Sequence, residues 1–466
     1  MQLAAALRDA IDVGTLRAGE SVPATRELGV RLGVARGVVV TAYEQLIAEG
    51  YLVAKHGRGT AVNPELATMQ AQLDTSHRLS EDRPALDEPA DRAREPLRPG
   101  VPIPSAVDSP AWRAAWRDAA TRAHLVAPPL GDPLLRAEIA DHLRSMRATA
   151  RPASDVIVTA GTRDGLGLLL TALGTTHGRG LIVGVEDPGL PSLRGVAARH
   201  GAQIVALPTD EEGLDTSRLP DGLLDVVIVT PSHQYPLGGS LPLVRRRELL
   251  AWARNAGVIV VEDDFDSELR YTGSPLPTLA ALDHAVSGSV VLLGTFSRTV
   301  APALSAGYML VPQSLRSLVE PARRELGGPV STVVQAALAH YLASGELRRH
   351  TARLLRRYAE RRDLVSERFA GVRGVIVRPM DGGLHAVLEF VGSAAEKLRE
   401  REEVVVRLSR DAGLGAQPLG GYWQRHGEGM AGLVIGLGGA NELEFDAALT
   451  ELRSMLVEAT ATATPA

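Results

Sequence analysis

Apolar residues near the start of the chain recur with the period of an α-helix. Residues 3–12 carry them at the i, i+4, i+7 and i+8 positions of an amphipathic helix. A short helix capped by Thr25 is expected to end at Gly33, and a longer helix is expected to end at Gly50. Two short strands around a tight turn follow. Three helices and a hairpin predict a winged helix-turn-helix over residues 1–64.

The N-terminal end of the expected third helix is placed to read the major groove of DNA. Arg36 can pair with a guanine edge through two hydrogen bonds, and Val38 can touch a thymine methyl group. On the hairpin, Lys55, His56 and Arg58 would meet phosphates or the minor groove. The alternative is a small structural cap whose arginines are only solvated. Because this domain holds seven Lys and Arg against six Asp and Glu, a single copy is expected to bind DNA weakly.

Residues 65–109 differ in composition from the sequence on either side. They are polar, rich in charge and proline, and contain no aromatic residue. Such a segment cannot bury enough apolar surface to fold alone. It therefore predicts a flexible linker between the helix-turn-helix and the rest of the chain.

Strand-like apolar runs alternate with helical segments from residue 110 onward. Continuous Val, Ile and Leu runs are typical of strands covered on both faces, and the alternation predicts a three-layer α/β domain. We expect a large part at 110–327, a smaller C-terminal part at 328–458 and a disordered tail at 459–466. The expected strands are Val156–Thr159, Leu181–Val185, Gln203–Leu207, Val226–Thr230, Val258–Val261, Val290–Leu293 and Gly307–Val311, with others near 375–378 and 384–388.

Polar, Gly-containing or acidic turns follow five of these strands. Ligands of open α/β sheets bind beside the carboxyl ends of the strands. The turn "AGTRDG" leads into a helix and suits an anion on free backbone N–H groups. The other turns are "EDPGLP", "PSHQYPLGG", "EDDFDSEL" and "GTFSRT". Together they predict a ligand pocket at one edge of the sheet.

Composition limits the chemistry of that pocket. The chain has no cysteine, which excludes disulfides and thiolate metal sites, and no metal site is predicted. Of its 50 basic residues, only Lys55 and Lys397 are lysines, so few side-chain amines are available as nucleophiles. Acids at the start argue against a signal peptide, and no apolar run reaches the roughly 20 residues that span a bilayer. A cytoplasmic protein is expected.

Three N-terminal motifs, "VPATREL", "GVARGVVVTAYEQLIAEGYL" and "KHGRGTAV", resemble the DNA-binding module of the GntR family of bacterial regulators. The resemblance implies that Arg26, Arg36, His56 and Gly57 contact a double-stranded DNA operator. Further along, "TPSHQYPLGG", "EDDFDSELRY" and "GTFSRTVAPAL" resemble the fold-type I aminotransferase domain. The whole chain is similar to the MocR branch of GntR regulators, which implies a head-to-tail homodimer and a pocket for pyridoxal phosphate.

Several positions depart from the pattern of these relatives. The lysine that forms an imine with pyridoxal phosphate is Arg298 here, and a guanidinium offers no neutral amine at neutral pH. Leu190 replaces the tyrosine that stacks on the cofactor ring. Phe265 replaces the tyrosine that bonds the ring hydroxyl, and Ser305 replaces the arginine that binds the phosphate. These losses predict that the pocket holds no covalent pyridoxal phosphate and does not catalyse.

Other positions keep the pattern. Asp263 matches the acid that pairs with the pyridine nitrogen, and Arg163 and His233 belong to the same predicted pocket. A ligand that is anionic or zwitterionic would lie between Arg298 and Asp263, or a salt bridge between those two residues would fill the site. The positions that match the phosphate side are Gly161, Thr162, Thr295 and Ser297, although turns and helix caps also require such residues.

The favoured interpretation is a DNA-binding transcriptional regulator whose aminotransferase-like domain dimerises and senses a small molecule. One alternative is a pyridoxal-phosphate-dependent aminotransferase with an attached DNA-binding domain, against which Arg298 argues directly. Another is a DNA-binding dimer whose large domain is a ligand-independent scaffold.

Overall fold

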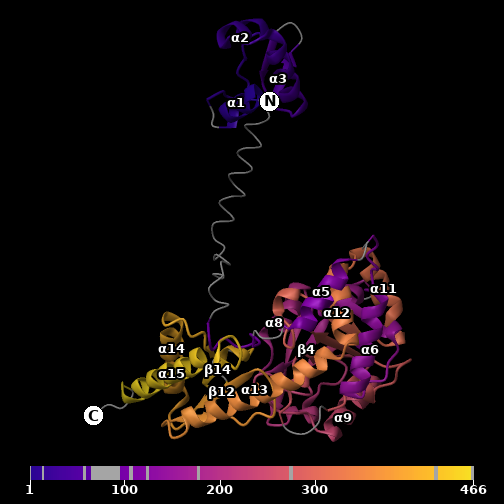
Figure 1. The fold of residues 1–466 in the computed structure, drawn as a ribbon, viewed down its shortest axis with the longest axis vertical. Helices are drawn as coiled ribbons and strands as arrows, with labels where there is room; N and C mark the ends of the chain where they lie inside the picture. Colours follow the sequence, from indigo (N-terminus) through magenta and orange to yellow (C-terminus); the bar gives the residue numbers. More distant parts are fainter. Residues whose placement is uncertain are drawn as a thin grey trace. The chain divides into compact units, whose positions relative to one another are not determined.

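The computed structural model describes the following parts of the chain: residues 2–12, 15–55, 59–64, 95–103, 109–121, 125–175, 179–271, 276–424 and 429–462. The chain divides into two compact units, residues 1–89 and residues 90–466. Both units are drawn in Figure 1. Each has its own hydrophobic core.

In the described residues of the N-terminal unit, three helices and a hairpin are present, as predicted. They are α1 (Gln2–Asp12), α2 (Thr25–Leu32), α3 (Arg36–Ala48), β1 (Leu52–Lys55) and β2 (Gly59–Val62). After α2, Gly33 adopts a left-handed φ of 65°, which glycine reaches without a side-chain clash. The prediction that Thr25 caps α2 is wrong, because Thr25 is already helical and the extended Ala24 holds the N-cap position.

The longest helix of this unit, α3, has one buried face. Val39, Tyr43 and Leu46 are spaced i, i+4 and i+7 and pack against α1 and the hairpin. The Tyr43 hydroxyl donates a hydrogen bond of 2.8 Å to the carbonyl of Pro23. The opposite face of α3 remains available for a partner.

The second unit is built on an eight-stranded sheet of order β3-β10-β9-β8-β7-β4-β5-β6. β4, β5, β7, β8 and β9 run parallel, and β10 is antiparallel to both β3 and β9. The carboxyl ends of β3, β4, β7, β8 and β9 therefore meet at one edge. The strands are β3 (Val156–Thr159), β4 (Ile182–Asp187), β5 (Gln203–Asp210), β6 (Gly213–Leu214), β7 (Val226–Val229), β8 (Ile259–Asp264), β9 (Val290–Thr295) and β10 (Gly307–Leu310).

Helices cover both faces of this sheet, which confirms the predicted three-layer fold. One face packs on α7 (Thr162–Gly174), α8 (Pro191–Arg199) and α11 (Gln313–Leu326). The other packs on α5 (Pro110–Ala120), α6 (Pro133–Arg147), α9 (Leu243–Ala256), α10 (Leu279–Leu282) and α12 (Thr332–Ala343). Strand residues alternate between the two cores: Val260 faces the second set and Val261 faces the first.

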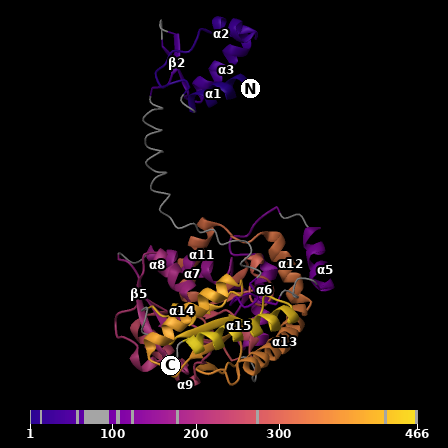
Figure 2. The same cartoon turned by 90° about the vertical axis from the view of Figure 1, so that its left-hand side faces the viewer.

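A smaller part follows, with an antiparallel sheet of order β11-β12-β14-β13. Its helices α14 and α15 lie side by side in Figure 2. Helix α15 continues to Thr462, so residues 459–462, predicted to belong to a disordered tail, are helical; Ala459 packs on the core of this part. The elements are α13 (Glu346–Phe369), β11 (Val375–Val377), β12 (His385–Phe390), α14 (Ala395–Asp411), β13 (Gln417–Pro418), β14 (Gly432–Gly436) and α15 (Glu442–Thr462).

Residues 95–103, predicted to be part of the linker, instead pack on this smaller part; we call them the strap. Leu97 and Ile103 are fully buried in its core. The strap is rich in proline, so its composition gave no sign that these two apolar residues would be buried. Burial of those residues, together with hydrogen bonds to β14 and α13, fixes a segment with no helix or strand of its own. The rest of the predicted linker, residues 65–94 and 104–108, lies outside the described residues.

Candidate functional site

The exposed end of α3 carries the residues predicted to read DNA bases. Arg36 is the first residue of the helix, after an extended Ala35. Arg36 is exposed, and 49% of the Val38 surface is accessible. Because the buried residues of α3 lie on its opposite face, both side chains are free to enter a groove. In a helix-turn-helix, this is the end that contacts base edges.

Arg26 lies on α2, the helix that precedes α3 in the chain. Its side chain is exposed and, among the described residues, makes no hydrogen bond or ion pair. It is therefore available to a phosphate. Lys55 ends β1, but its side chain, together with His56, Gly57 and Arg58, lies outside the described residues. The contacts predicted for the hairpin stay predictions.

Three consecutive acids end β8 at the predicted pocket. Glu262 accepts hydrogen bonds from the amides of Leu279 and Ala280 (2.9 and 3.1 Å). Asp264 pairs with the guanidinium of Arg147, which is also buried, with a shortest N–O distance of 2.5 Å. Asp263 points to the other face of the strand. Only 3% of Asp263 is exposed, and its Oδ1 has no hydrogen-bond partner within the described part of the chain.

Arg298 follows β9 at the same edge of the sheet. Its Nη1 donates a hydrogen bond to the carbonyl of Gly100 in the strap. The salt bridge considered between Arg298 and Asp263 does not form, because no ion pair or hydrogen bond joins the two side chains. Lys397 is exposed on α14 of the smaller part, at the start of that helix. Its position gives no support for a substitute amine in the pocket.

The residues predicted on the phosphate side lie together at the turns after β3 and β9. Gly161 is the N-cap of α7 with φ 100°, and Thr162 begins that helix. A side chain at Gly161 would lie 3.7 Å from Thr295 Oγ1, so the two turns are neighbours. The Thr295 hydroxyl hydrogen-bonds that of Ser297 at 3.0 Å. Ser305 lies on an exposed turn with a left-handed φ of 44°.

An apolar and aromatic cluster occupies the region beside Asp263. Phe265 packs there, with Leu190 at its edge. Tyr235 of the large part and Tyr422 of the smaller part meet edge to face, with ring centroids 5.3 Å apart. The other members are Leu237, Met380, Val387, Leu419, Trp423 and Val434. The cluster joins the large and small parts through direct contacts between side chains.

His233 lies at the border of this cluster. Its Nδ1 is 3.0 Å from the nearer carboxylate oxygen of Asp266, and its ring stacks near Phe265 at 6.1 Å. Its Nε2 is buried and has no partner among the described residues. Two residues of the predicted pocket therefore each have a buried polar atom without a partner among the described residues, Nε2 of His233 and Oδ1 of Asp263.

Burial controls the ionisation of the acids in this region. It raises the pKa of Asp263 well above the usual range of a carboxylic acid, and the neighbouring Asp264 adds to the increase, whereas Arg298 opposes it. Burial also raises the pKa of Glu186 to about 7, although Thr230 donates two hydrogen bonds to that carboxyl. A carboxyl with a raised pKa holds its proton, so Asp263 can donate a hydrogen bond, and a positively charged group beside it would favour its ionised form.

Comparison with known proteins identifies both units. Residues 1–62 match the bacterial regulatory proteins of the gntR family, and residues 104–414 match the family of aminotransferase class I and II. The HTH-type pyridoxine biosynthesis transcriptional regulator PdxR of Corynebacterium glutamicum is 42% identical over 445 residues, which cover 95% of this chain and 92% of that protein. This chain belongs to the GntR-type transcriptional regulators that carry an aminotransferase-like domain. It is a DNA-binding regulator of the MocR type.

A second relative agrees with that assignment, and solved structures of other proteins share the fold of the second unit. The probable rhizopine catabolism regulatory protein MocR of Rhizobium meliloti is 30% identical over 470 residues, which cover 97% of the regulator and 92% of that protein. An archaeal alanine:glyoxylate aminotransferase has a TM-score of 0.69 at 18% identity and covers 79% of the regulator and 91% of its own chain. A multiple substrate aminotransferase of Thermococcus profundus has a TM-score of 0.68 at 21% identity and covers 82% and 97%. These structures show the fold.

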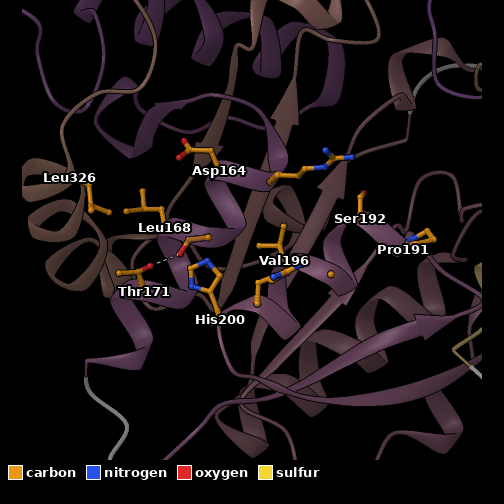
Figure 3. Close-up of a pocket in the computed structure, with 12 residues that line it drawn as sticks. Asp164, Leu168, Thr171, Pro191, Ser192, Val196, His200 and Leu326 are labelled. Carbon is orange, nitrogen blue, oxygen red and sulfur yellow. Dashed lines mark hydrogen bonds between the residues drawn. The ribbon is translucent and has the colours of Figure 1, made fainter. Parts of the chain in front are cut away.

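A surface groove of about 700 Å³ lies between α7 and α8 of the regulator (Figure 3). Leu168 and Thr171 of α7 line one side, and Val196 and His200 line the other. Arg163, predicted to belong to the cofactor pocket, is exposed and lines this groove. The groove does not include Asp263 or Arg298.

The described ranges of the regulator contain no group of three or more His, Asp and Glu side chains that could hold a metal ion. None of the helices in those ranges is long and apolar enough to cross a bilayer.

Sequence reasoning missed three residues of the pocket region. Gly100 was hidden in a stretch with the composition of a linker. Glu186 ends a buried strand run, and an acid at that place was a usable signal. Tyr422 comes from the smaller part, far along the chain, and only the tertiary structure brings it to Tyr235.

Proposed function

We propose that the aminotransferase-like unit of this regulator binds a small ligand reversibly and does not catalyse a reaction. The supporting observation is the pair Asp263 and Arg298. Oδ1 of the buried Asp263 has no partner among the described residues, and Arg298 donates a hydrogen bond to the Gly100 carbonyl. By resemblance to fold-type I aminotransferases, position 298 is the one expected to hold the imine-forming lysine. A ligand that binds one conformation of the unit more tightly than another lowers the free energy of that conformation. This shift between conformations is how an effector changes the activity of a regulator.

The first ligands to test are pyridoxine, pyridoxal and their phosphates. The related protein of Corynebacterium glutamicum is named as a regulator of pyridoxine biosynthesis. A protonated pyridine nitrogen is a donor that suits Asp263, and a bound pyridoxal phosphate would supply an aldehyde and a phosphate. The residues fit the ring nitrogen of this group and do not fit covalent attachment, because Arg298 has no neutral amine.

The regulator acts, in this proposal, as a cytoplasmic head-to-tail homodimer on a double-stranded DNA operator. Its N-terminal domain carries a small net charge, so two linked copies are needed for tight binding. The exposed Leu125, Val126 and Leu326 of the second unit support a contact surface between copies. Gly328 lies beside the carbonyl of Pro128, which brings the chain near Leu326 close to the segment after Val126.

The test compares wild type with Arg298→Lys in the full-length protein. Each is mixed with pyridoxal phosphate, treated with borohydride and analysed by mass spectrometry of its peptides. We expect the Lys variant to gain the cofactor mass at position 298 and the wild type to gain none in the pocket. The two natural lysines, Lys55 and Lys397, report background labelling.

Reversible binding is measured separately by titration calorimetry with pyridoxine 5′-phosphate. Asp263→Asn should weaken binding about tenfold or more, because it removes a charge-assisted hydrogen bond. Covalent attachment in the wild-type pocket would contradict the proposal. Failure of every pyridoxine compound to bind would exclude this ligand class.

A further inference from the structure

The strap is fixed at both ends and passes the pocket in its middle. At one end, the Leu97 amide donates to the Leu414 carbonyl at 2.9 Å, and the Gly436 amide donates to the Leu97 carbonyl at 2.7 Å. At the other, the Ile103 amide donates to the Tyr358 hydroxyl at 2.9 Å. These contacts hold the strap against β14 and α13.

The middle of the strap depends on Gly100. Its φ is 82°, a left-handed value that residues with side chains rarely adopt. A Cβ atom at this position would lie only 3.0 Å from Cζ of Arg298. Among the described residues, the guanidinium of Arg298 has one hydrogen-bond partner, the carbonyl of Gly100. A guanidinium has five N–H donors, so this arginine has donors left for a ligand.

Arg298 lies between the pocket and the strap. Burial raises the pKa of Asp263 on the pocket side and that of Tyr358, which holds the strap, on the other, and the positive charge of Arg298 opposes both increases. Its present partner is a neutral carbonyl oxygen. A hydrogen bond from a guanidinium to a phosphate or carboxylate is roughly twice as strong as one between neutral groups. An anionic ligand therefore competes well with Gly100 for this side chain.

We propose that Arg298 switches between two partners, the Gly100 carbonyl without ligand and the anionic group of a ligand bound against Asp263. The switch rests on the proposed function, because it describes how ligand binding in that pocket is transmitted to the strap. Release of Gly100 loosens the strap. Residue 95, at the start of the strap, follows the stretch that connects the second unit to the DNA-binding unit. Ligand binding in the pocket thereby changes the segment through which the two units are covalently joined.

The tether is tested first without ligand, by hydrogen exchange of the full-length protein followed by mass spectrometry. Arg298→Met keeps a side chain of similar length and removes every donor. We expect exchange at the Leu97 and Ile103 amides to rise about tenfold or more, because a hydrogen bond from a charged group is lost. The matched control Arg163→Met removes an exposed arginine of α7 and should leave the strap unchanged. Unchanged exchange in folded Arg298→Met would overturn the switch.

A second measurement uses wild type alone, in case Arg298→Met does not fold. Pyridoxine 5′-phosphate is titrated while its binding is followed by calorimetry and the strap by hydrogen exchange. We expect strap exchange to rise in step with saturation. If the compound binds and strap exchange stays constant, the switch is wrong and the proposed function stands. If no pyridoxine compound binds, that ligand class is wrong, and the Arg298→Met result alone decides the switch.

Discussion

At the scale of single residues, neighbouring acids of one strand acquire different properties from their surroundings. Glu262 and Asp264 face one core and have amide or guanidinium partners, whereas Asp263 faces the other and has an oxygen without a partner. The sequence "EDD" contains no sign of this difference. It arises because successive side chains of a strand point to opposite faces.

The buried Glu186 makes the stability of the regulator depend on pH. Its pKa rises from 4.5 to about 7 on folding, so the folded state binds a proton more tightly than the unfolded chain. Its contribution is therefore present below pH 4.5 and decreases as the pH rises through 7. Glu186→Gln keeps an acceptor for Thr230 without a charge. We expect the variant to gain stability over wild type as the pH rises from 5 to 8, by up to about 3 kcal/mol.

Urea unfolding at several pH values measures this difference. Glu360→Gln, which changes an exposed glutamate of α13, is the matched control and should show no such trend. Parallel pH profiles for wild type and Glu186→Gln would show that Glu186 is ionised in the folded protein.

At the scale of elements, α3 shows how one helix serves two purposes. Its buried residues Val39, Tyr43 and Leu46 form the core of the N-terminal unit. The residues at its exposed N-terminal end do not contribute to that core, so we expect substitutions there to have little effect on folding and, if this end reads bases, to alter DNA binding. This separation makes the DNA-reading hypothesis testable.

Arg36→Ala should weaken binding to DNA that the wild type selects from a random pool by about 1–3 kcal/mol, and should relax the preference for guanine at one position. Fluorescence anisotropy measures the affinity. Arg31→Ala, on the exposed surface of α2, removes an i, i+4 ion pair with Glu27 and is the control. We expect it to change binding much less. Equal effects of the two variants would indicate that Arg36 contributes only general charge.

At the scale of the whole molecule, the second unit leaves apolar side chains uncovered. Leu125 and Val126 are 90% and 76% exposed in the segment before α6. When exposed apolar residues gather in one patch, they mark a surface that a partner covers. The proposed homodimer gives these residues a function.

Val126→Asp places a charge in this surface, and we expect it to weaken the dimer at least tenfold, because a buried unpaired charge is costly. Sedimentation velocity over a range of concentrations measures the association. Leu443→Asp is the matched control, since Leu443 is 85% exposed at the start of α15, in the smaller part. A dimer equally stable in both variants would place the interface elsewhere.

The sequence alone determined the elements, the order of the domains and the absence of an amine at position 298. These are local properties: apolar periodicity encodes helices and strands, and a residue type is read directly. The strands β3 and β11 were predicted within one residue because their apolar runs have clear ends. The charged residues that extend β8 were assigned to a turn, since their pairing with β9 depends on another part of the chain.

Only the tertiary structure decided the arrangement of the pocket. It placed Gly100 of the strap against Arg298, left Oδ1 of Asp263 without a partner among the described residues and brought Tyr422 to Tyr235. It also placed Arg163 at a surface groove and extended α15 into the predicted tail. Each of these outcomes depends on contacts between residues distant in the sequence, whose burial and hydrogen bonds outweigh local preference.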